Sequence, residues 1–122
     1  MLVGDATIGA EVTRLMANDA ADLFFTDPPY DVDYEGYTED GLKIKGDRMS
    51  DAEFKQFLEA AFRSCRTAAK PGASLYVCHS SSWQREFQNA LESAGFEVRC
   101  QIIWAKNTGR EHFEYQHTVR LQ

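Results

Sequence analysis

Residues 23–30 read Leu-Phe-Phe-Thr-Asp-Pro-Pro-Tyr, and this stretch decides the fold. Its aromatic and β-branched start predicts a buried β-strand, which the two prolines end because neither donates a backbone hydrogen bond and both have a fixed φ. A residue before a proline is pushed toward extended backbone, so we expect Asp27 at the carboxyl end of the strand. Ligands bind at that end of the strands in open α/β sheets. The stretch therefore predicts a site that joins an acid, two carbonyl acceptors and an aromatic ring.

The rest of the chain alternates between helical and strand patterns. Strands are expected over residues 22–26, 73–78 and 96–105, with a weaker candidate over residues 114–121. Helices are expected over residues 8–17, from residue 50 to the Lys70-Pro71-Gly72 stop, and from the serines at 80–82 to residue 94. Alternating strands and helices predict a parallel α/β sheet with right-handed crossovers.

The two longer helices carry the clearest local signals. Ser50 and Glu53 have the spacing of a capping box, in which each side chain accepts a hydrogen bond from the other's backbone N–H. Gly95 is expected just beyond the end of the last helix. Apolar residues follow at helical spacing after Ser50 and form one stripe: Phe54, Phe57, Leu58, Ala61, Phe62 and Cys65. A second stripe faces the predicted sheet: Phe87, Ala90, Leu91 and Ala94.

Length and composition indicate a single domain that works in a reducing compartment. The chain has 122 residues, which suits one moderate core, and no apolar stretch approaches the roughly 18 residues of a membrane span. No signal-peptide pattern occurs at the start. Cys65, Cys78 and Cys100 are widely spaced within apolar patterns, so we expect core thiols in a cytoplasmic protein and no metal site. The net charge of −6 disfavours a strongly basic nucleic-acid surface within this chain.

The Asp27-Pro28-Pro29-Tyr30 segment resembles the catalytic motif of the amino-group DNA methyltransferases, which methylate adenine N6 or cytosine N4. Further similarity lies in Gly4-Asp5-Ala6-Thr7 upstream and in Val32-Asp33-Tyr34 and Lys43-Ile44-Lys45-Gly46-Asp47 downstream. The resemblance is to the branch whose catalytic motif precedes the cofactor motif. It implies a partial Rossmann-like class I methyltransferase sheet with flanking helices, with residues 1–122 as the N-terminal, catalytic-motif part of that domain.

The resemblance also implies roles for the four motif residues. Asp27 and a carbonyl of Pro28 or Pro29 accept hydrogen bonds from the exocyclic amine, which aims its lone pair at the methyl group of S-adenosylmethionine. Tyr30 stacks on a base that has been flipped out of the duplex. Asp5 and Ala6 correspond to residues that contact the adenosine of the cofactor.

Several residues outside the motif have either a structural interpretation or a functional one. His79 either lines the pocket or is structural, and Trp83 and Trp104 are interpreted as packing residues. The polar stretch 31–49 is long for a compact domain and is interpreted as a flexible loop. Its Lys43, Lys45 and Arg48 either touch phosphates or are solvated, and its acids match no known metal loop.

One departure from the family concerns the cofactor motif. No G-x-G occurs in these residues, whereas the family's glycine motif ends a strand. Against the family's sheet order 3-2-1-4-5-7-6, the strands expected here correspond to 3, 4, 5 and 6, with the weaker candidate over residues 114–121 as strand 7. Strands 1 and 2 are then missing, and the strand that carries Asp27 lies at an apolar edge. Such an edge is usually covered, so we expect self-association there, or a chain that is part of a longer protein.

The resulting hypothesis is a DNA methyltransferase, with adenine N6 favoured over cytosine N4 because cytosine enzymes often have Ser at the position of Asp27. One alternative keeps the chemistry and changes the substrate to RNA or protein, although those relatives usually carry Asn-Pro-Pro-Tyr. The other is a non-catalytic remnant that acts as a binding or assembly module.

Overall fold

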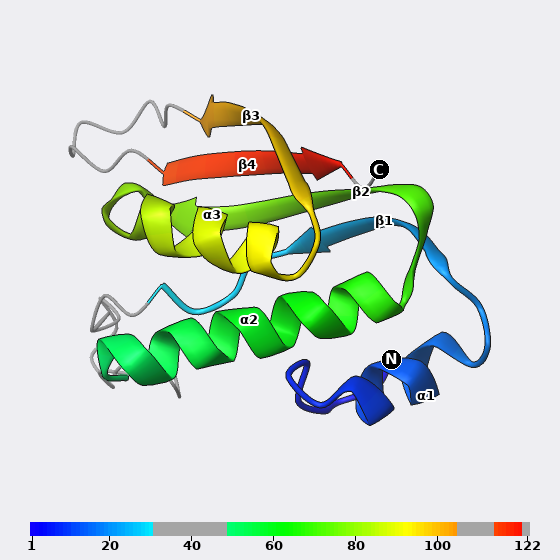
Figure 1. Cartoon of the computed structure of the whole chain (residues 1–122). Helices are drawn as coiled ribbons and strands as arrows, with labels where there is room; N and C mark the ends of the chain where they lie inside the picture. Colours follow the sequence, from blue (N-terminus) through cyan, green and yellow to red (C-terminus); the bar gives the residue numbers. More distant parts are fainter. Residues whose placement is uncertain (31–48, 105–113, 121–122) are drawn as a thin grey trace, which may run out of the picture.

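A computed structural model of the chain describes residues 1–30, 49–104 and 114–120. Three helices alternate with strands along the chain (Figure 1). The helices are α1 (Gly9–Met16), α2 (Asp51–Thr67) and α3 (Gln84–Ser93), and a 3-10 turn, η1 (Ser81–Trp83), precedes α3. The strands are β1 (Ala21–Thr26), β2 (Ala69–Ser80), β3 (Glu97–Trp104) and β4 (Glu114–Arg120). Most of the stretch predicted to be a flexible loop, residues 31–48, lies outside the described residues.

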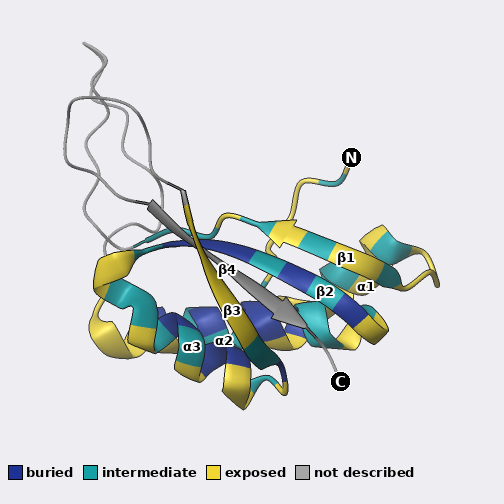
Figure 2. Cartoon of the chain, turned by 90° about the horizontal axis from the view of Figure 1, so that it is seen from above, coloured by how far each residue is buried: buried dark blue, intermediate teal, exposed yellow. Residues whose placement is uncertain are grey.

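The described strands form one mixed sheet in the order β1-β2-β4-β3. β1 runs parallel to β2, while β4 is antiparallel to both β2 and β3. The crossovers through α2 and α3 therefore both join parallel strands and both move in the same direction across the sheet. Because such crossovers are right-handed, the two helices must lie on the same face. Figures 1 and 2 show α2 and α3 on one face, and no described helix covers the other.

The hydrophobic core lies between this pair of helices and β2. Its fully buried members are aromatic and aliphatic side chains at the predicted helical spacing and at alternate positions of the strand: Phe54, Leu58, Phe62, Phe87, Leu91, Leu75 and Val77. Phe87 is the centre of an aromatic group, with ring centroids 6.0 Å from Phe54 and 6.2 Å from Phe62. Figure 2 shows the buried residues gathered on α2, α3 and β2.

The ends of both long helices follow the sequence signals. The capping box at the start of α2 is present, with Ser50 N donating to Glu53 Oε2 over 2.9 Å and Glu53 N donating to Ser50 Oγ over 3.4 Å. At the end of α3, Gly95 has φ +86°, and the N–H groups of Gly95 and Phe96 donate to Glu92 and Leu91. This pair of bonds is a Schellman motif, which suits a glycine at that position.

The stop predicted at Lys70-Pro71-Gly72 lies instead inside a strand. Helix α2 already ends at Thr67, and β2 begins at Ala69. The pairing of β1 with β2 shifts register here, from Ala21 opposite Ala69 to Leu23 opposite Ser74. A bulge tolerates proline because no ladder bond is needed there, and Gly72, at φ +77°, accepts a backbone that other residues rarely adopt.

The strand predicted to be buried, β1, is the edge of the described sheet. Phe24 packs against the core, but Leu23 is 55% exposed and Phe25 is 64% exposed. Both side chains lie on the face that α2 and α3 do not cover, where Phe25 stacks on Tyr76 with centroids 6.5 Å apart. The edge position of this strand is confirmed for the described residues, while its predicted burial is wrong.

The start of the chain does not supply a further strand. Residues 1–8 contain no strand, and α1 buries none of its side chains. The expected strand 3 of the family order therefore has no counterpart among the described residues. Among the described residues, no helix is both long and apolar enough to cross a lipid bilayer.

Candidate active site

Asp27 lies directly after β1, and the parallel neighbour β2 continues past this point to Ser80. The two strands are parallel, and the last pair, Thr26 opposite Val77, puts the residues that follow them side by side. Asp27 is exposed to solvent, and the two prolines after it are half-buried. The side chain therefore stands at the carboxyl end of a parallel strand pair, as the sequence predicts.

Tyr30 closes this turn. Its hydroxyl donates a hydrogen bond to Asp27 Oδ1, across Pro28 and Pro29. Its ring is half-buried and packs against the hydrophobic core. The motif thus brings together the two side chains predicted to share a site. The bond between them is new, since the sequence analysis gave Tyr30 a role through its ring alone.

His79 follows on β2 and is completely buried. Its ring stacks on Phe87 with centroids 5.0 Å apart, and its Nδ1 lies 2.7 Å from the carbonyl oxygen of Ser80. Burial lowers the pKa of this imidazole below its ordinary value of 6.5, which the contact with the Ser80 carbonyl partly offsets. Of the two interpretations of His79, the structure supports the structural one: the ring belongs to the core.

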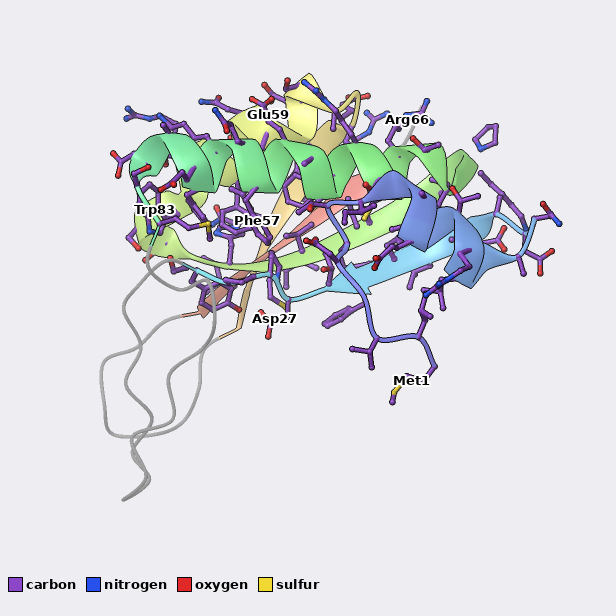
Figure 3. All side chains as sticks on the ribbon, turned by 90° about the horizontal axis from the view of Figure 1, so that it is seen from below. Met1, Asp27, Phe57, Glu59, Arg66 and Trp83 are labelled. Carbon is purple, nitrogen blue, oxygen red and sulfur yellow. The ribbon has the colours of Figure 1, made fainter. Side chains whose placement is uncertain are left out.

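The tryptophan just beyond β2 is also a packing residue, as predicted. Trp83 lies against the core, edge-on to Phe54, with centroids 4.9 Å apart. Figure 3 shows Asp27, Phe57 and Trp83 at the same end of the molecule, with Phe57 on α2. Phe57 and Trp83 both pack against the hydrophobic core.

Asp5 lies in a separate, local network at the start of the chain. Its Oδ1 accepts hydrogen bonds from the backbone N–H of Thr7, over 2.9 Å, and from the Thr7 hydroxyl, over 2.7 Å. These two bonds stabilise the charged form and hold the pKa of Asp5 below its usual range. Its backbone N–H donates to Glu11 Oε2 over 2.6 Å. Among the described residues, no hydrogen bond joins Asp5 to Asp27.

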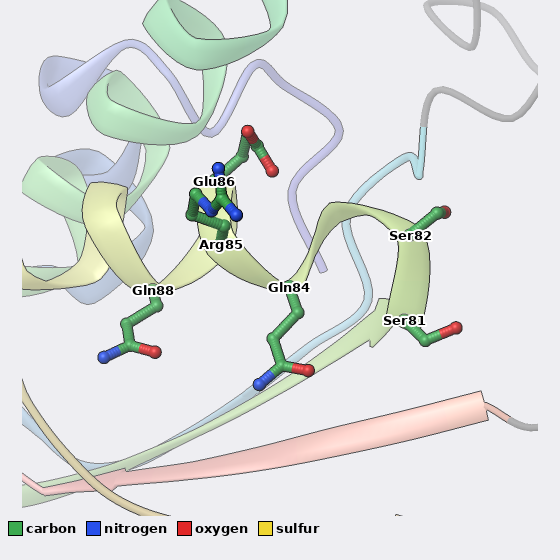
Figure 4. A pocket seen from close by; sticks show the side chains of 6 residues that line it. All are labelled: Ser81, Ser82, Gln84, Arg85, Glu86 and Gln88. Atoms are coloured by element: carbon green, nitrogen blue, oxygen red, sulfur yellow. The ribbon is translucent and has the colours of Figure 1, made fainter.

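A broad polar hollow of about 610 Å³ opens at the start of α3 (Figure 4). Polar and charged side chains of η1 and the first turns of α3 line it: Ser81, Ser82, Gln84, Arg85, Glu86 and Gln88. The hollow begins where β2 ends, because Ser81 directly follows Ser80. No motif in these residues predicts this hollow.

Several predicted residues lie where the structure gives no description. Lys43, Lys45 and Arg48, interpreted as phosphate contacts or solvated side chains, fall within residues 31–48, as do the acids weighed as a metal site. The side chain of Trp104 is likewise not described. Within residues 1–30 and 49–104, no group of His, Cys, Asp and Glu is arranged to hold a metal ion.

Comparison with known proteins gives a consistent family. A model of the N6/N4 DNA methylases matches residues 21–121. The type II methyltransferase M.HinfI of Haemophilus influenzae is 25% identical over 127 aligned positions, which cover 91% of this chain and 34% of that protein. The chain thus spans about a third of the length of this curated relative.

Solved structures agree on the fold. The complex of M1.HpyAVI with SAM has a TM-score of 0.63 at 17% identity and covers 99% of this chain and 52% of its own. TTHA0409 of Thermus thermophilus, solved with S-adenosyl-L-methionine, has a TM-score of 0.63 at 22% identity, with 98% and 54% covered. These likenesses confirm the predicted fold class, a partial Rossmann-like class I methyltransferase sheet with flanking helices.

Proposed function

The chain belongs to the N6/N4 DNA methylase family, and from that premise we propose that it carries the catalytic motif of an S-adenosylmethionine-dependent DNA methyltransferase. The reaction is transfer of a methyl group to the exocyclic amine of a base, with adenine N6 favoured over cytosine N4. The supporting observation is the place of Asp27: an exposed carboxylate at the carboxyl end of a parallel strand pair, followed by two half-buried prolines.

The proposed reaction requires the chain to orient a weak nucleophile, the exocyclic amine of the base. The lone pair of an exocyclic amine is delocalised into the ring of the base. Asp27 accepts a hydrogen bond from the amine, and the carbonyl of Pro28 or Pro29 accepts a second, so the nitrogen becomes more tetrahedral. The nitrogen then bonds to the methyl carbon as the carbon–sulfur bond breaks, and the amine loses one proton to water. Alignment of this kind accounts for a large part of the acceleration in many enzymes.

S-adenosylmethionine, when bound, supplies an electrophilic methyl group on a sulfonium, so the protein contributes mainly orientation and electrostatics. Asp5 fits a role as a hydrogen-bond acceptor for S-adenosylmethionine. Its Oδ1 already accepts two bonds from Thr7, while the carboxylate as a whole is exposed and has further acceptor capacity. Asp5 and Ala6 would hold a donor group of the cofactor, as the family resemblance implies.

The amine of a paired base is out of reach of Asp27, so the base has to be flipped out of the duplex. Stacked, unpaired bases pack well on aromatic side chains. We assign the stacking role to Tyr30, whose half-buried ring lies three residues after Asp27. From the family resemblance we propose a cytoplasmic setting of bacterial or phage type, such as a restriction-modification system.

The first experiment is calorimetric titration of S-adenosylmethionine into the chain, followed by transfer of a radiolabelled methyl group to DNA. We expect micromolar binding, and we expect Asp27→Ala to abolish transfer while far-ultraviolet circular dichroism stays unchanged. Asp19→Ala is the matched control, because Asp19 is an exposed carboxylate on the loop before β1. Equal loss of transfer in both variants, or full transfer by Asp27→Ala, contradicts the proposal.

A second candidate is a binding or assembly module, and the edge strand favours it. In the described sheet β1 has a neighbour on one side only, and Leu23 and Phe25 are exposed beside it. We propose that a second copy of the chain covers this edge, because exposed apolar edge strands pair readily. Sedimentation velocity over a concentration series tests this: a dimer is expected, and a monomer at all concentrations contradicts it.

A further inference from the structure

The turn that leads into α1 is held by two side chains, one on each side of its carboxylate. Thr7 donates two hydrogen bonds to Asp5 Oδ1, from its backbone N–H over 2.9 Å and from its hydroxyl over 2.7 Å. Glu11, on α1, accepts the backbone N–H of Asp5 on its Oε2 over 2.6 Å. We propose that Thr7 and Glu11 are positioning residues, which hold Asp5 ready for the adenosine of S-adenosylmethionine. This inference rests on the proposed function, in which Asp5 contacts the cofactor.

Thr7 determines which oxygen of Asp5 faces a ligand. Both of its donors reach Oδ1, and no hydrogen bond between described residues reaches Oδ2. An ionised carboxylate has about four acceptor positions, so Oδ2 is open to a hydroxyl or amine of the cofactor. The side chain is exposed, which leaves this oxygen accessible.

Glu11 fixes the backbone of the same turn. Its bond from Asp5 N is charge-assisted and ties the turn to the first residues of α1. The glycine at position 4 makes room for this bond, since a Cβ on Gly4 would lie 2.1 Å from Glu11 Oε2. A larger residue at position 4 therefore displaces the carboxylate of Glu11 and breaks its bond to Asp5.

The network acts on cofactor binding and not on the methyl-transfer step. An exposed aspartate without such bonds samples several rotamers, and ordering it when the ligand binds lowers the affinity. By the family resemblance Asp5 contacts the adenosine, which does not change while the methyl group leaves the sulfonium. Thr7 and Glu11 therefore act on the KM for S-adenosylmethionine and not on kcat. S-adenosylhomocysteine has the same adenosine, so its affinity depends on them equally.

The first experiment tests the hydroxyl of Thr7 by calorimetric titration of both ligands into the whole chain. Thr7→Val keeps the shape of the side chain and removes its donor, and we expect about fivefold weaker binding of each ligand. Thr7→Ser keeps the hydroxyl and should restore the affinity. Thr13→Val is the matched control, because the Thr13 hydroxyl donates to the carbonyl oxygen of Gly9 within α1. An affinity of Thr7→Val equal to that of Thr13→Val overturns the role of Thr7.

The second experiment tests the bond of Glu11 from both ends. Glu11→Ala removes the acceptor, and Gly4→Ala displaces it, so each should weaken both ligands about fivefold. Because the two changes break one bond, the double variant should bind no more weakly than either single variant. Glu59→Ala, which removes an exposed helix glutamate paired with Arg63, is the matched control. Losses that add in the double variant overturn the role of Glu11.

These variants should leave the fold intact, because α1 buries none of its side chains. A readout without ligand is the carbon-13 titration of the Asp5 carboxyl. The two bonds from Thr7 hold the pKa of this carboxyl below its usual range, so Thr7→Val should raise it and Thr13→Val should not. An unmoved pKa in Thr7→Val overturns the orientation of Asp5 by Thr7.

The outcomes separate this inference from the proposed function. Weaker ligand binding by the variants of a chain that transfers no methyl group to DNA supports the positioning role and contradicts the proposed function alone. Unchanged ligand binding by the variants of a chain that methylates DNA overturns the inference alone. A wild-type chain that binds neither ligand overturns both.

Discussion

Two phenylalanines show how differently the two sides of the sheet are built. Phe87 on α3 is completely buried on the covered face, between aromatic rings of α2 and the ring of His79. Phe25 on β1 is 64% exposed on the uncovered face, with Tyr76 beside it. The difference shows that the core of this chain is made by α2, α3 and β2, and that β1 contributes mainly its backbone pairing.

The candidate site lies on the boundary between these regions. Asp27 extends from the exposed edge strand, whereas Tyr30, three residues later, reaches back to the packed core. The motif therefore links a solvent-facing carboxylate to the rigid part of the molecule. A site of this kind needs both: exposure for the substrate and a fixed support for the reacting group.

The sharpest test of the comparison replaces each phenylalanine in turn. We expect Phe87→Ala to lower the free energy of unfolding by about 3–5 kcal/mol, because it removes a buried ring and leaves a cavity. In the monomer, at concentrations below the proposed dimerisation, Phe25→Ala should change it by less than about 0.5 kcal/mol, as exposed substitutions usually do. Urea unfolding followed by circular dichroism measures both. A comparable cost for Phe25→Ala would mean that the uncovered face is buried in solution, as in a dimer.

A smaller effect on stability is expected from the N-terminal cap of α2, which α1 lacks. Helix α2 begins with a capping box at Ser50, while the residue that caps α1, Ile8, makes no side-chain hydrogen bond. Ser50→Ala should cost about 1 kcal/mol of unfolding free energy, because an N–H at the helix start loses its partner. Ser93→Ala, in the exposed last turn of α3, is the control and should cost less than about 0.5 kcal/mol. Equal costs would contradict the cap.

The free energy of unfolding is expected to depend on pH because His79 is buried on the covered face. Burial holds the pKa of His79 below 6.5 in the folded chain, so the unfolded chain binds a proton more readily. Stability therefore falls as the pH drops below about 6.5, and the fall ends once the folded-state pKa is passed. Unfolding midpoints in urea between pH 7.5 and 5.5 should show this decline in the wild type and a weaker one in His79→Gln. An identical slope in both would rule out His79 as its source.

The smallest expected effect is at the edge strand. Lys70 Nζ lies 2.7 Å from Asp22 Oδ2, but both side chains are well exposed. Pairs of this kind contribute about 0–1 kcal/mol and are screened by salt. Lys70→Met, which keeps most of the apolar stem, should change the unfolding free energy by about 0.5 kcal/mol or less. A cost well above 1 kcal/mol that persists at high salt would show that this edge is desolvated in solution.

The sequence predicted the covered face well, for a local reason. The apolar stripe of α2 after Ser50, the capping box and the Gly95 stop all depend on residues within four or five positions of one another. Such signals are complete in the sequence. The start of β2 was misplaced because proline and glycine also occur at β-bulges, and the shift in register that permits them here depends on β1.

The candidate site was predicted in part. Asp27 at the end of its strand follows from the prolines, and its position is confirmed. The hydroxyl bond from Tyr30 and the burial of His79 against Phe87 were not predicted. The first is a local contact across two prolines that no motif records. The second depends on α3, which carries Phe87 over β2. The roles of Asp5 and Ala6 toward a cofactor remain predictions.

By itself, the sequence determined the family, the alternation of helices and strands, and the placement of an acid at a strand end. Apolar periodicity, capping and proline geometry act over a few neighbouring residues, so they can be read directly from the sequence. The tertiary structure alone decided that β4 lies between β2 and β3, that both helices cover the same face, and that β1 is left exposed. These outcomes depend on pairing between segments that are distant in the sequence and on the handedness of the crossovers between them. No local sequence pattern records either of these.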